Sequence, residues 1–194
     1  MTLSPIHLRN IPPPPETFNH PEFLELFCKW LKPERYLELG VRSGHCFRKV
    51  APLCKEAIGV DLIPWSEIPE YLRNVFIPNN INYINMSTDE YFEQLSDDMM
   101  FDAVFIDADH SHEQSLKDFL NVKDRIIEDG FVFFHDTYPY DESYINPHFS
   151  DTVYLTALYI KKNFGSEFEQ VTLPFNPGFT ICKKININKQ LIYK

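Results

Sequence analysis

The sequence predicts an α/β fold: a Rossmann-like, doubly wound and mainly parallel sheet with an antiparallel hairpin at its C-terminal end. Three observations lead to this prediction. Apolar segments typical of buried strands alternate with amphipathic segments typical of helices, which is the order of parallel strands joined by crossover helices. The first of these strands runs directly into a turn that contains Gly40 and Gly44. Polar residues follow strand after strand, as expected where an open α/β sheet binds a ligand at its carboxyl edge.

The N-terminal part of the chain is expected to contain an arm and then a helix. Residues 1–19 include four consecutive prolines at positions 12–15, which exclude a helix or a central strand and favour an extended conformation. We interpret them as a surface arm, with a disordered tail as the alternative. The helix begins near Pro21 and stops at Lys32-Pro33. Its apolar residues recur at helical spacing: Phe23, Leu24, Phe27, Trp30 and Leu31.

The main domain, residues 20–184, contains the remaining elements. Strands are expected at 36–39, 57–61, 81–85, 101–107 and 131–134, and two further strands at 168–173 and 178–183 form the hairpin. Helices are expected at 45–50, within 64–76, and at 87–95, 111–129 and 150–163. Ser87 and Ser111 each begin a capping box, Gly130 is expected to end a helix, and Ser150 or Asp151 to cap the last one. Residues 185–194 are an unassigned tail.

The composition argues against several classes of function. With a net charge of −10 and no basic stripe, the chain is not expected to bind a nucleic-acid backbone. We find no signal peptide and no apolar run long enough to span a bilayer. The four cysteines lack Cys-x-x-Cys spacing, so a cysteine-based zinc site is not expected. We therefore expect a cytoplasmic protein with reduced cysteines that acts on a small molecule, and a homodimer is compatible with the sequence.

The polar residues that follow the strands are the main functional signal. In a parallel sheet the carboxyl ends of the strands share one edge, so their side chains converge on one crevice. A single polar residue there is common by chance, but a series in chain order is much less so. The series is Glu38, Asp61, Asn85, Asp107 and the pair His135-Asp136.

The glycine turn and Asp61 together indicate a nucleoside-containing cofactor. A turn at a helix N-terminus presents backbone N–H groups to a ligand, although an ordinary strand–helix corner is the alternative. Asp61 lies about 20 residues further on, where an acidic residue can bind ribose hydroxyls. The candidates are a dinucleotide and S-adenosyl-L-methionine. Arg42 occupies the place of the middle glycine of the dinucleotide fingerprint, which disfavours NAD.

Three motifs resemble those of class I S-adenosylmethionine-dependent methyltransferases, in particular their small O-methyltransferase branch of the sugar or macrocin type. Residues 38–44, Glu-Leu-Gly-Val-Arg-Ser-Gly, resemble the first motif of the superfamily. Residues 105–113 resemble the branch's I-D-x-x-H-x-Y-E segment, with His112 in place of Tyr. Residues 130–137 match the end of its G-G-x-x-x-x-H-D-T segment, with Asp129 in place of the first Gly.

The resemblance implies a set of cofactor-binding residues. It places Gly40, Ser43 and Gly44 against the methionine part of S-adenosyl-L-methionine, with Glu38 beneath them. It assigns Asp61 to the ribose. It places Met86 and Ser87 at the border of the adenine, although Ser87 is also expected to cap a helix.

The resemblance also implies the position of the chemistry. Asp107 lies beside the expected methyl group, and in metal-dependent relatives the matching Asp and a polar pair after the fifth strand bind Mg²⁺. Here the candidates are Asp107, His135 and Asp136, of which the two carboxylates, Asp107 and Asp136, would suffice for Mg²⁺. Metal dependence stays open because His135 is a poor ligand for a hard cation. His110, in the loop over the crevice, is the expected general base, with His135 as the alternative base. His112 is expected to be structural.

The acceptor is expected to be a small hydroxylated molecule. A sugar or glycan hydroxyl is the first choice by resemblance, and a catechol or phenol with strict Mg²⁺ dependence is the second. A catalytically inactive cofactor-binding scaffold and an NAD-dependent oxidoreductase are further alternatives. The loop at 137–149 is expected to hold the acceptor through Tyr138, Tyr140, Tyr144 and His148.

Overall fold

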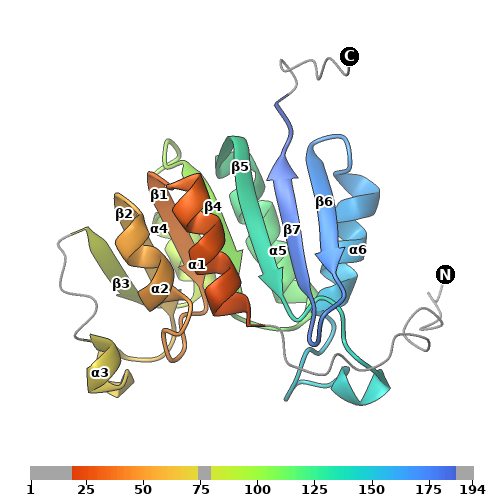
Figure 1. Ribbon diagram of the computed structural model, residues 1–194, viewed down its shortest axis with the longest axis horizontal. Helices are drawn as coiled ribbons and strands as arrows, with labels where there is room; N and C mark the ends of the chain where they lie inside the picture. The colour runs from red at the N-terminus through yellow and green to blue at the C-terminus, as the bar shows by residue number, and fades with distance from the viewer. Residues whose placement is uncertain (1–18, 74–79, 187–194) are drawn as a thin grey trace.

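The computed structural model describes residues 19–73 and 80–186, which form one seven-stranded sheet flanked by helices (Figure 1). The residues expected to form the arm, apart from Asn19, and most of those expected to form the tail lie outside these ranges. The strands are β1 Arg35–Leu39, β2 Glu56–Asp61, β3 Ile81–Asn85, β4 Phe101–Ile106, β5 Ile126–His135, β6 Phe168–Leu173 and β7 Phe179–Lys184. The helices are α1 His20–Leu31, α2 Phe47–Val50, α3 Glu70–Arg73, α4 Thr88–Gln94, α5 His112–Val122 and α6 Val153–Asn163.

The strand order confirms the predicted fold class. The order is β3-β2-β1-β4-β5-β7-β6, with parallel pairing from β3 through to β5. Strand β7 inserts antiparallel between β5 and β6, so the C-terminal hairpin forms one end of the sheet and β6 is its edge. The order reverses between β1 and β4, and this is the point at which open α/β sheets bind ligands.

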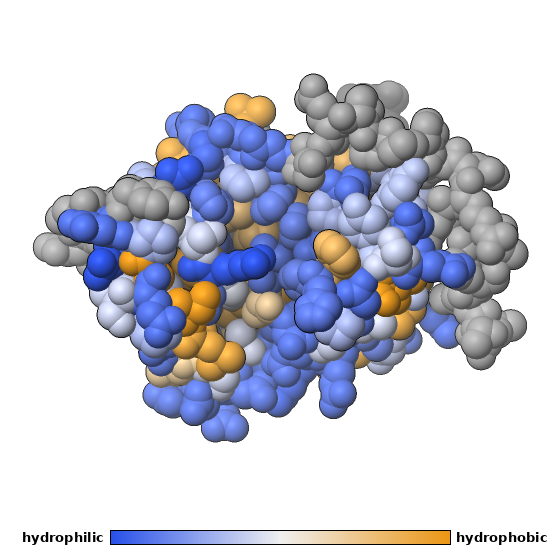
Figure 2. All heavy atoms as spheres, turned by 90° about the horizontal axis from the view of Figure 1, so that it is seen from below, coloured by the Kyte–Doolittle hydropathy of each residue, from blue (hydrophilic) through white to orange (hydrophobic). Residues whose placement is uncertain are grey.

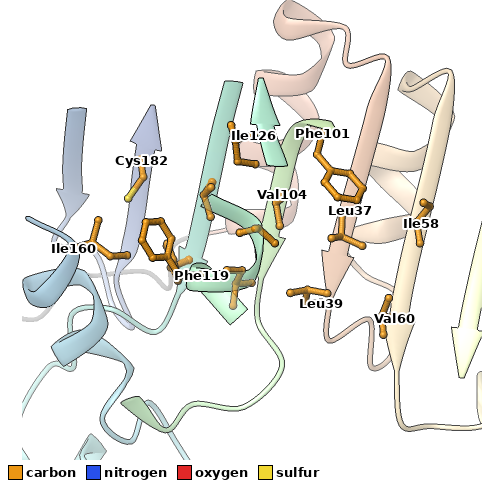
Figure 3. Close-up of a cluster of buried hydrophobic side chains, with 14 of the residues drawn as sticks. Leu37, Leu39, Ile58, Val60, Phe101, Val104, Phe119, Ile126, Ile160 and Cys182 are labelled. Carbon is orange, nitrogen blue, oxygen red and sulfur yellow. The ribbon is translucent and has the colours of Figure 1, made fainter. Parts of the chain in front are cut away.

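Helices cover both faces of the sheet. Helices α1 and α2 lie on one face, and α4, α5 and α6 lie on the other (Figure 1). Side chains alternate along each strand, so Leu37 and Leu39 of β1 join the apolar cluster beneath the second group of helices (Figure 3). Tyr36 joins the cluster beneath α1 and α2. Burial on both faces explains why β4 reads as an almost continuous apolar run.

Local signals set the ends of several elements as predicted. Pro21 lies in the first turn of α1, as predicted, and Asn19, for which no cap was predicted, accepts a hydrogen bond from the Glu22 N–H through its side chain. Helix α1 ends at Leu31, and its C-cap residue Lys32 has a left-handed φ of 51°. Helix α4 has the complete capping box, because Ser87 and Glu90 exchange side-chain and backbone hydrogen bonds.

Other local predictions are wrong. Gly130 does not end a helix: α5 stops at Val122, and Gly130 lies inside β5, at an irregularity that pairs Phe101 with Ile126 but Ala103 with Phe131. The glycine is needed there because a Cβ would lie 2.9 Å from the Ile127 carbonyl oxygen and 3.0 Å from that of Asp102.

Three further predictions about caps and packing fail for identifiable reasons. The N-cap of α6 is Thr152, without a side-chain bond, because Ser150 is buried and engaged elsewhere. At α5 only Ser111 caps, because the Gln114 amide reaches to Thr88 and Asp118 instead. Trp30, expected on the buried face of α1, is 70% exposed. In the described part of the chain, no helix has the length and apolar character needed to cross a bilayer.

Candidate active site

The predicted crevice lies at the carboxyl edge of the parallel strands. Leu39 at the end of β1 is level with Val60 of β2 and Ile106 of β4, so the loops after these strands leave the sheet side by side. Two adjoining cavities open there, of about 680 Å³ and about 280 Å³, and both are lined by Gly40 and Asp61. Figure 2 looks onto this edge and shows mainly hydrophilic residues around it.

The predicted site residues are distributed over the two cavities. Met86 and Ser87 line the smaller one, together with Leu62 and Gln114. Gly44 is buried and lines neither cavity. The other predicted residues line the larger cavity: Glu38, Gly40, Ser43, Asp61, Asp107, His110, His135 and Asp136.

The glycine turn is tied to the end of β2 by Asp61. The Arg42 N–H donates to Asp61 Oδ2 at 2.5 Å, and the Ile63 N–H donates to Asp61 Oδ1 at 2.8 Å. The turn is left-handed at Gly40, Arg42 and Gly44, with φ values of 88°, 48° and 71°. A ligand that hydrogen-bonds to this carboxylate therefore meets a group whose orientation is already fixed.

Gly40 is required by the neighbouring loop as well as by the turn. A Cβ at this position would lie 2.3 Å from the Asp107 carbonyl oxygen and 2.5 Å from the Ala108 Cα. From the sequence, the lack of a side chain at this glycine was expected to let a ligand approach closely. In the structure it also lets the backbone after β4 approach, which brings Asp107 up to the glycine turn.

Glu38 forms the buried floor of the larger cavity. Its carboxylate accepts a 2.6 Å hydrogen bond from the Tyr36 hydroxyl, and only 1% of the residue is exposed. Burial raises the pKa of Glu38 well above its usual value, against the opposing effect of the Tyr36 hydrogen bond.

An ionic cluster stands at the ends of β4 and β5. His135 Nδ1 lies 2.8 Å from Asp136 Oδ2 and 3.2 Å from Asp107 Oδ1. His110 Nε2 lies 3.3 Å from Asp136 Oδ2 and 3.5 Å from Asp107 Oδ1. Two imidazoles therefore stand between two carboxylates, and the four residues predicted to carry the chemistry are brought together.

The cluster shifts the pKa values of its members. The hydrogen bond to Asp107 is the largest influence on His110 and raises its pKa to about 9. Burial opposes the charge on His135, but Asp107 and Asp136 outweigh it and raise its pKa to about 10. Burial likewise opposes the charge on Asp107, yet the two histidines hold its pKa below the usual range. Both imidazoles are thus protonated while they face the carboxylates, and accepting a proton requires their separation from these groups.

Residues from the following loop hold the cluster in position. The Ser150 hydroxyl is buried and donates to Asp136 Oδ1 at 2.9 Å, and Asp136 itself has a left-handed φ of 59°. His110 Nδ1 contacts the carbonyl oxygen of Phe149. His112 faces away, with its Nδ1 2.8 Å from the Thr156 hydroxyl, which agrees with the structural role predicted for it.

Sequence reasoning missed His20, which starts α1 and lines the larger cavity. Its ring centroid lies 3.9 Å from that of His135. Burial, and then the neighbouring His135, lower the pKa of His20 to about 4, so this imidazole is neutral. The sequence carries no signal for this contact, because the direction in which α1 crosses the sheet is set by packing.

The tyrosines expected to hold an acceptor do not line either cavity. Tyr140 and Tyr144 are 6.3 Å apart between ring centroids, and Tyr144 is 5.2 Å from Phe149, so these rings pack against one another. Of the predicted acceptor residues only His148 lines the larger cavity. Among the described residues no Phe, Tyr or Trp lines either cavity, so both walls are built from polar and aliphatic groups.

Two groups of side chains could hold a metal ion, and they share Asp107. One is Asp107, His110 and Asp136, and the other is His20, Asp107 and His135. In each group, one ligand atom per residue lies within 4.8 Å of the others. The first group has two carboxylates and the second has two imidazoles, so the two differ in the ions that they favour.

The family described as "Methyltransferase domain" matches residues 37–137. Among solved structures, the chain is similar to an O-methyltransferase from Bacillus cereus in complex with SAH, at 13% identity over 92% of this chain and 85% of that one (TM-score 0.66). It is similar to a candidate caffeoyl-CoA O-methyltransferase from Staphylococcus aureus, at 15% identity over 88% of this chain and 85% of that one (TM-score 0.65). It is also similar to the N-methyltransferase NodS from Bradyrhizobium japonicum WM9, at 14% identity over 87% and 98% (TM-score 0.57). At these identities the likeness establishes a shared fold. The chain has no match among curated proteins.

Proposed function

The chain belongs to the methyltransferase domain family, and from this premise we propose that it transfers the methyl group of S-adenosyl-L-methionine to a hydroxyl group of a sugar or glycan. The fold and the family support methyl transfer. The choice of acceptor is supported by the walls of the larger cavity.

The cofactor would extend across the two adjoining cavities. Its methionine part would be held by the turn formed by Gly40 and Ser43, with Glu38 beneath. Asp61 would bind its ribose, and the smaller cavity beside Met86 would take its adenine. The likeness to a Bacillus cereus O-methyltransferase in complex with SAH supports this cofactor.

The observation that carries the proposal is that the ionic cluster stands directly beside the glycine turn. Asp107 touches Gly40 through its backbone and reaches His135 with its carboxylate. A sulfonium methyl group is already activated, so the protein must align it with the acceptor oxygen, take up the proton of that oxygen and exclude water. We assign His110 as the general base that takes up this proton, with His135 as the alternative base. The acceptor must draw the chosen imidazole away from Asp107 and Asp136 before it can serve as a base.

Asp107 and Asp136 are the groups that would hold Mg²⁺. Both carboxylates face the cavity from neighbouring strand ends, and Mg²⁺ needs only one or two carboxylates because it retains several waters. A cation there would lower the pKa of the acceptor hydroxyl. His110 and His135 now occupy hydrogen-bonding positions on the same oxygens, so cation binding would require them to move.

The runner-up function is methylation of a catechol or phenol with Mg²⁺. The likeness to a candidate caffeoyl-CoA O-methyltransferase favours this alternative. The absence of Phe, Tyr and Trp from the described walls of the larger cavity disfavours it, because aromatic acceptors gain much of their affinity by stacking on such rings. An inactive scaffold is a third alternative, and the assembled cluster argues against it.

A methyl-transfer assay with labelled S-adenosyl-L-methionine tests the proposal. We expect labelled product from hydroxylated sugars and much less from catechols, with loss of product in Asp107→Asn. Product from catechols alone, and only with Mg²⁺, would replace the proposal with the runner-up. An Asp107→Asn variant as active as the wild type would exclude the mechanism.

A further inference from the structure

We propose that Gln114 selects the adenine base of the cofactor: its side-chain oxygen accepts a hydrogen bond from the 6-amino group, and Asp118 holds the amide in the orientation that this bond requires. Gln114 lies on α5 and lines the smaller cavity together with Leu62 and Met86. The inference rests on the proposed function, which supplies the cofactor. It deepens that function by naming the residue that distinguishes adenine from purines with a 6-oxo group.

The amide nitrogen of Gln114 is fully engaged by the protein. Nε2 lies 3.1 Å from Asp118 Oδ1, and it also lies 3.0 Å from Thr88 Oγ1 and 3.2 Å from Asp89 Oδ1. Two of these partners are carboxylates, which in their ionised form only accept hydrogen bonds, so this end of the amide must be the NH₂ group. The surrounding oxygens therefore set the orientation of the whole amide.

The amide oxygen is the open end of the side chain. Within residues 19–73 and 80–186, no group donates a hydrogen bond to Gln114 Oε1, and this oxygen is not sealed from solvent. Because the residue lines the smaller cavity, Oε1 is an acceptor that a ligand there can reach. The 6-amino group of adenine is a donor, whereas a 6-oxo group is an acceptor and would face Oε1 without a bond.

Asp118 is a buried carboxyl group that packing alone does not explain. The residue is fully buried, and its Oδ2 has no hydrogen-bond partner. Burial raises the pKa of Asp118 to about 6, against the opposing hydrogen bonds from Thr88 and Gln114. Such a group destabilises the folded state at neutral pH, so an apolar residue would serve the core better. Asp118 lies one helical turn after Gln114, and we assign it as a positioning residue that acts through the Gln114 amide.

Asp109 is the competing acceptor in the smaller cavity. Its Oδ1 accepts a hydrogen bond from the Ser111 N–H, and its other oxygen has no partner in the part of the chain that the structure describes. Asp89 also lines this cavity, but Lys117 and Gln114 already donate to its two oxygens. The experiment must therefore separate Gln114 from Asp109.

The test is calorimetric titration with SAH and with S-inosylhomocysteine, in which a 6-oxo group replaces the 6-amino group. The wild type should favour SAH by at least about 10-fold, because the oxo compound loses one hydrogen bond and places two acceptors opposite each other. In Gln114→Met, which keeps the length of the side chain without its amide, the ratio of the two affinities should fall to within about 3-fold of unity. Gln170→Met is the matched control, because the Gln170 amide donates to the Ala157 carbonyl oxygen and lines neither cavity.

Two variants of Asp118 test its positioning role. Asp118→Leu should lower the ratio part of the way, since Thr88 and Asp89 still accept from Nε2. Asp118→Asn should retain the wild-type ratio, because its carbonyl oxygen can still accept from Nε2. A ratio of two affinities is insensitive to a general loss of stability, so a merely structural role of Asp118 would leave it unchanged.

The outcomes separate this inference from the proposed function. A Gln114→Met variant that is folded by circular dichroism and keeps the wild-type ratio would overturn the inference, and Gln114→Leu replaces this variant if it is misfolded. Loss of discrimination in Asp109→Ala but not in Gln114→Met would also overturn it, by assigning the base to Asp109. SAH binding with an unchanged ratio would refute only the role of Gln114. A wild type that binds neither compound would refute the proposed function and this inference with it.

Discussion

Replacing Gly40 with alanine should both destabilise the fold and weaken the site. The residue has a φ of 88°, which costs an L-amino acid about 1–2 kcal/mol. Its Cβ would also lie 2.3 Å from the Asp107 carbonyl oxygen, about 1 Å inside an ordinary contact, and overpacking of this kind costs about 1–3 kcal/mol. The free energy of unfolding should therefore fall by about 2–5 kcal/mol. At about 2–4 °C per kcal/mol for a chain of this size, Tm should fall by about 4–20 °C.

Thermal unfolding followed by circular dichroism measures the first effect, and calorimetric titration with S-adenosyl-L-methionine measures the second. Because relief of the clash must push the backbone of Asp107 and Ala108 away from the glycine turn, cofactor affinity and methyl transfer should fall together. Gly59→Ala is a comparison without the positive φ: its Cβ would lie 2.6 Å from the Val41 side chain, so it should lose stability through overpacking alone. A Gly40→Ala variant with wild-type Tm and cofactor affinity would refute the reasoning.

Three further predictions concern side chains around the crevice. Burial raises the pKa of Asp118 from 3.8 to about 6, so the folded state holds the proton more tightly and loses about 3 kcal/mol of stability as pH rises from 4 through 6. Asp118→Asn should therefore unfold at a higher temperature than the wild type at pH 8 and at the same temperature below pH 4. Equal thermal unfolding curves at pH 8 would contradict the pKa shift. Ser87→Ala should lower stability by about 1 kcal/mol in urea unfolding through loss of the helix cap. Cofactor affinity should be unchanged, because the Ser87 hydroxyl is already bonded to Glu90. A large loss of cofactor affinity would show instead that Ser87 binds the adenine directly. Asp61→Asn should weaken the cofactor about 10- to 100-fold in calorimetry, because charge-assisted hydrogen bonds to the ribose are lost; unchanged affinity would remove Asp61 from the ribose site.

The sequence was sufficient to predict the parallel part of the sheet and its functional edge. Strands β1, β2, β4 and β5 are buried on both faces, so their apolar runs are unambiguous, and the residues that follow them share one edge by topology alone. For the same reason Asp107, His110, His135 and Asp136 could be placed in one cluster from the order of the strands. The capping box at Ser87 was predicted for a different reason, because its bonds are local in sequence.

The errors arise where tertiary packing overrides a local signal. Gly130 resembles a helix stop, but it serves a backbone contact with Asp102 in the neighbouring strand. Ser150 resembles an N-cap, but its hydroxyl bonds to Asp136, fourteen residues earlier. His20 gave no signal, because its neighbour His135 is more than 100 residues away and the contact depends on how α1 crosses the sheet. The tyrosines of the 137–149 loop resembled a ring-binding surface, yet Tyr140 and Tyr144 pack on each other.

Calorimetric titration of the wild-type protein with S-adenosyl-L-methionine, with NAD in a parallel cell, tests the central claim most directly. The two adjoining cavities at the glycine turn predict saturable one-site binding of S-adenosyl-L-methionine and no binding of NAD, because Arg42 occupies the position where a pyrophosphate needs glycine. Binding should weaken in Gly40→Ala and Asp61→Asn. If the protein fails to bind S-adenosyl-L-methionine with or without Mg²⁺, or binds NAD instead, the account of this site is contradicted.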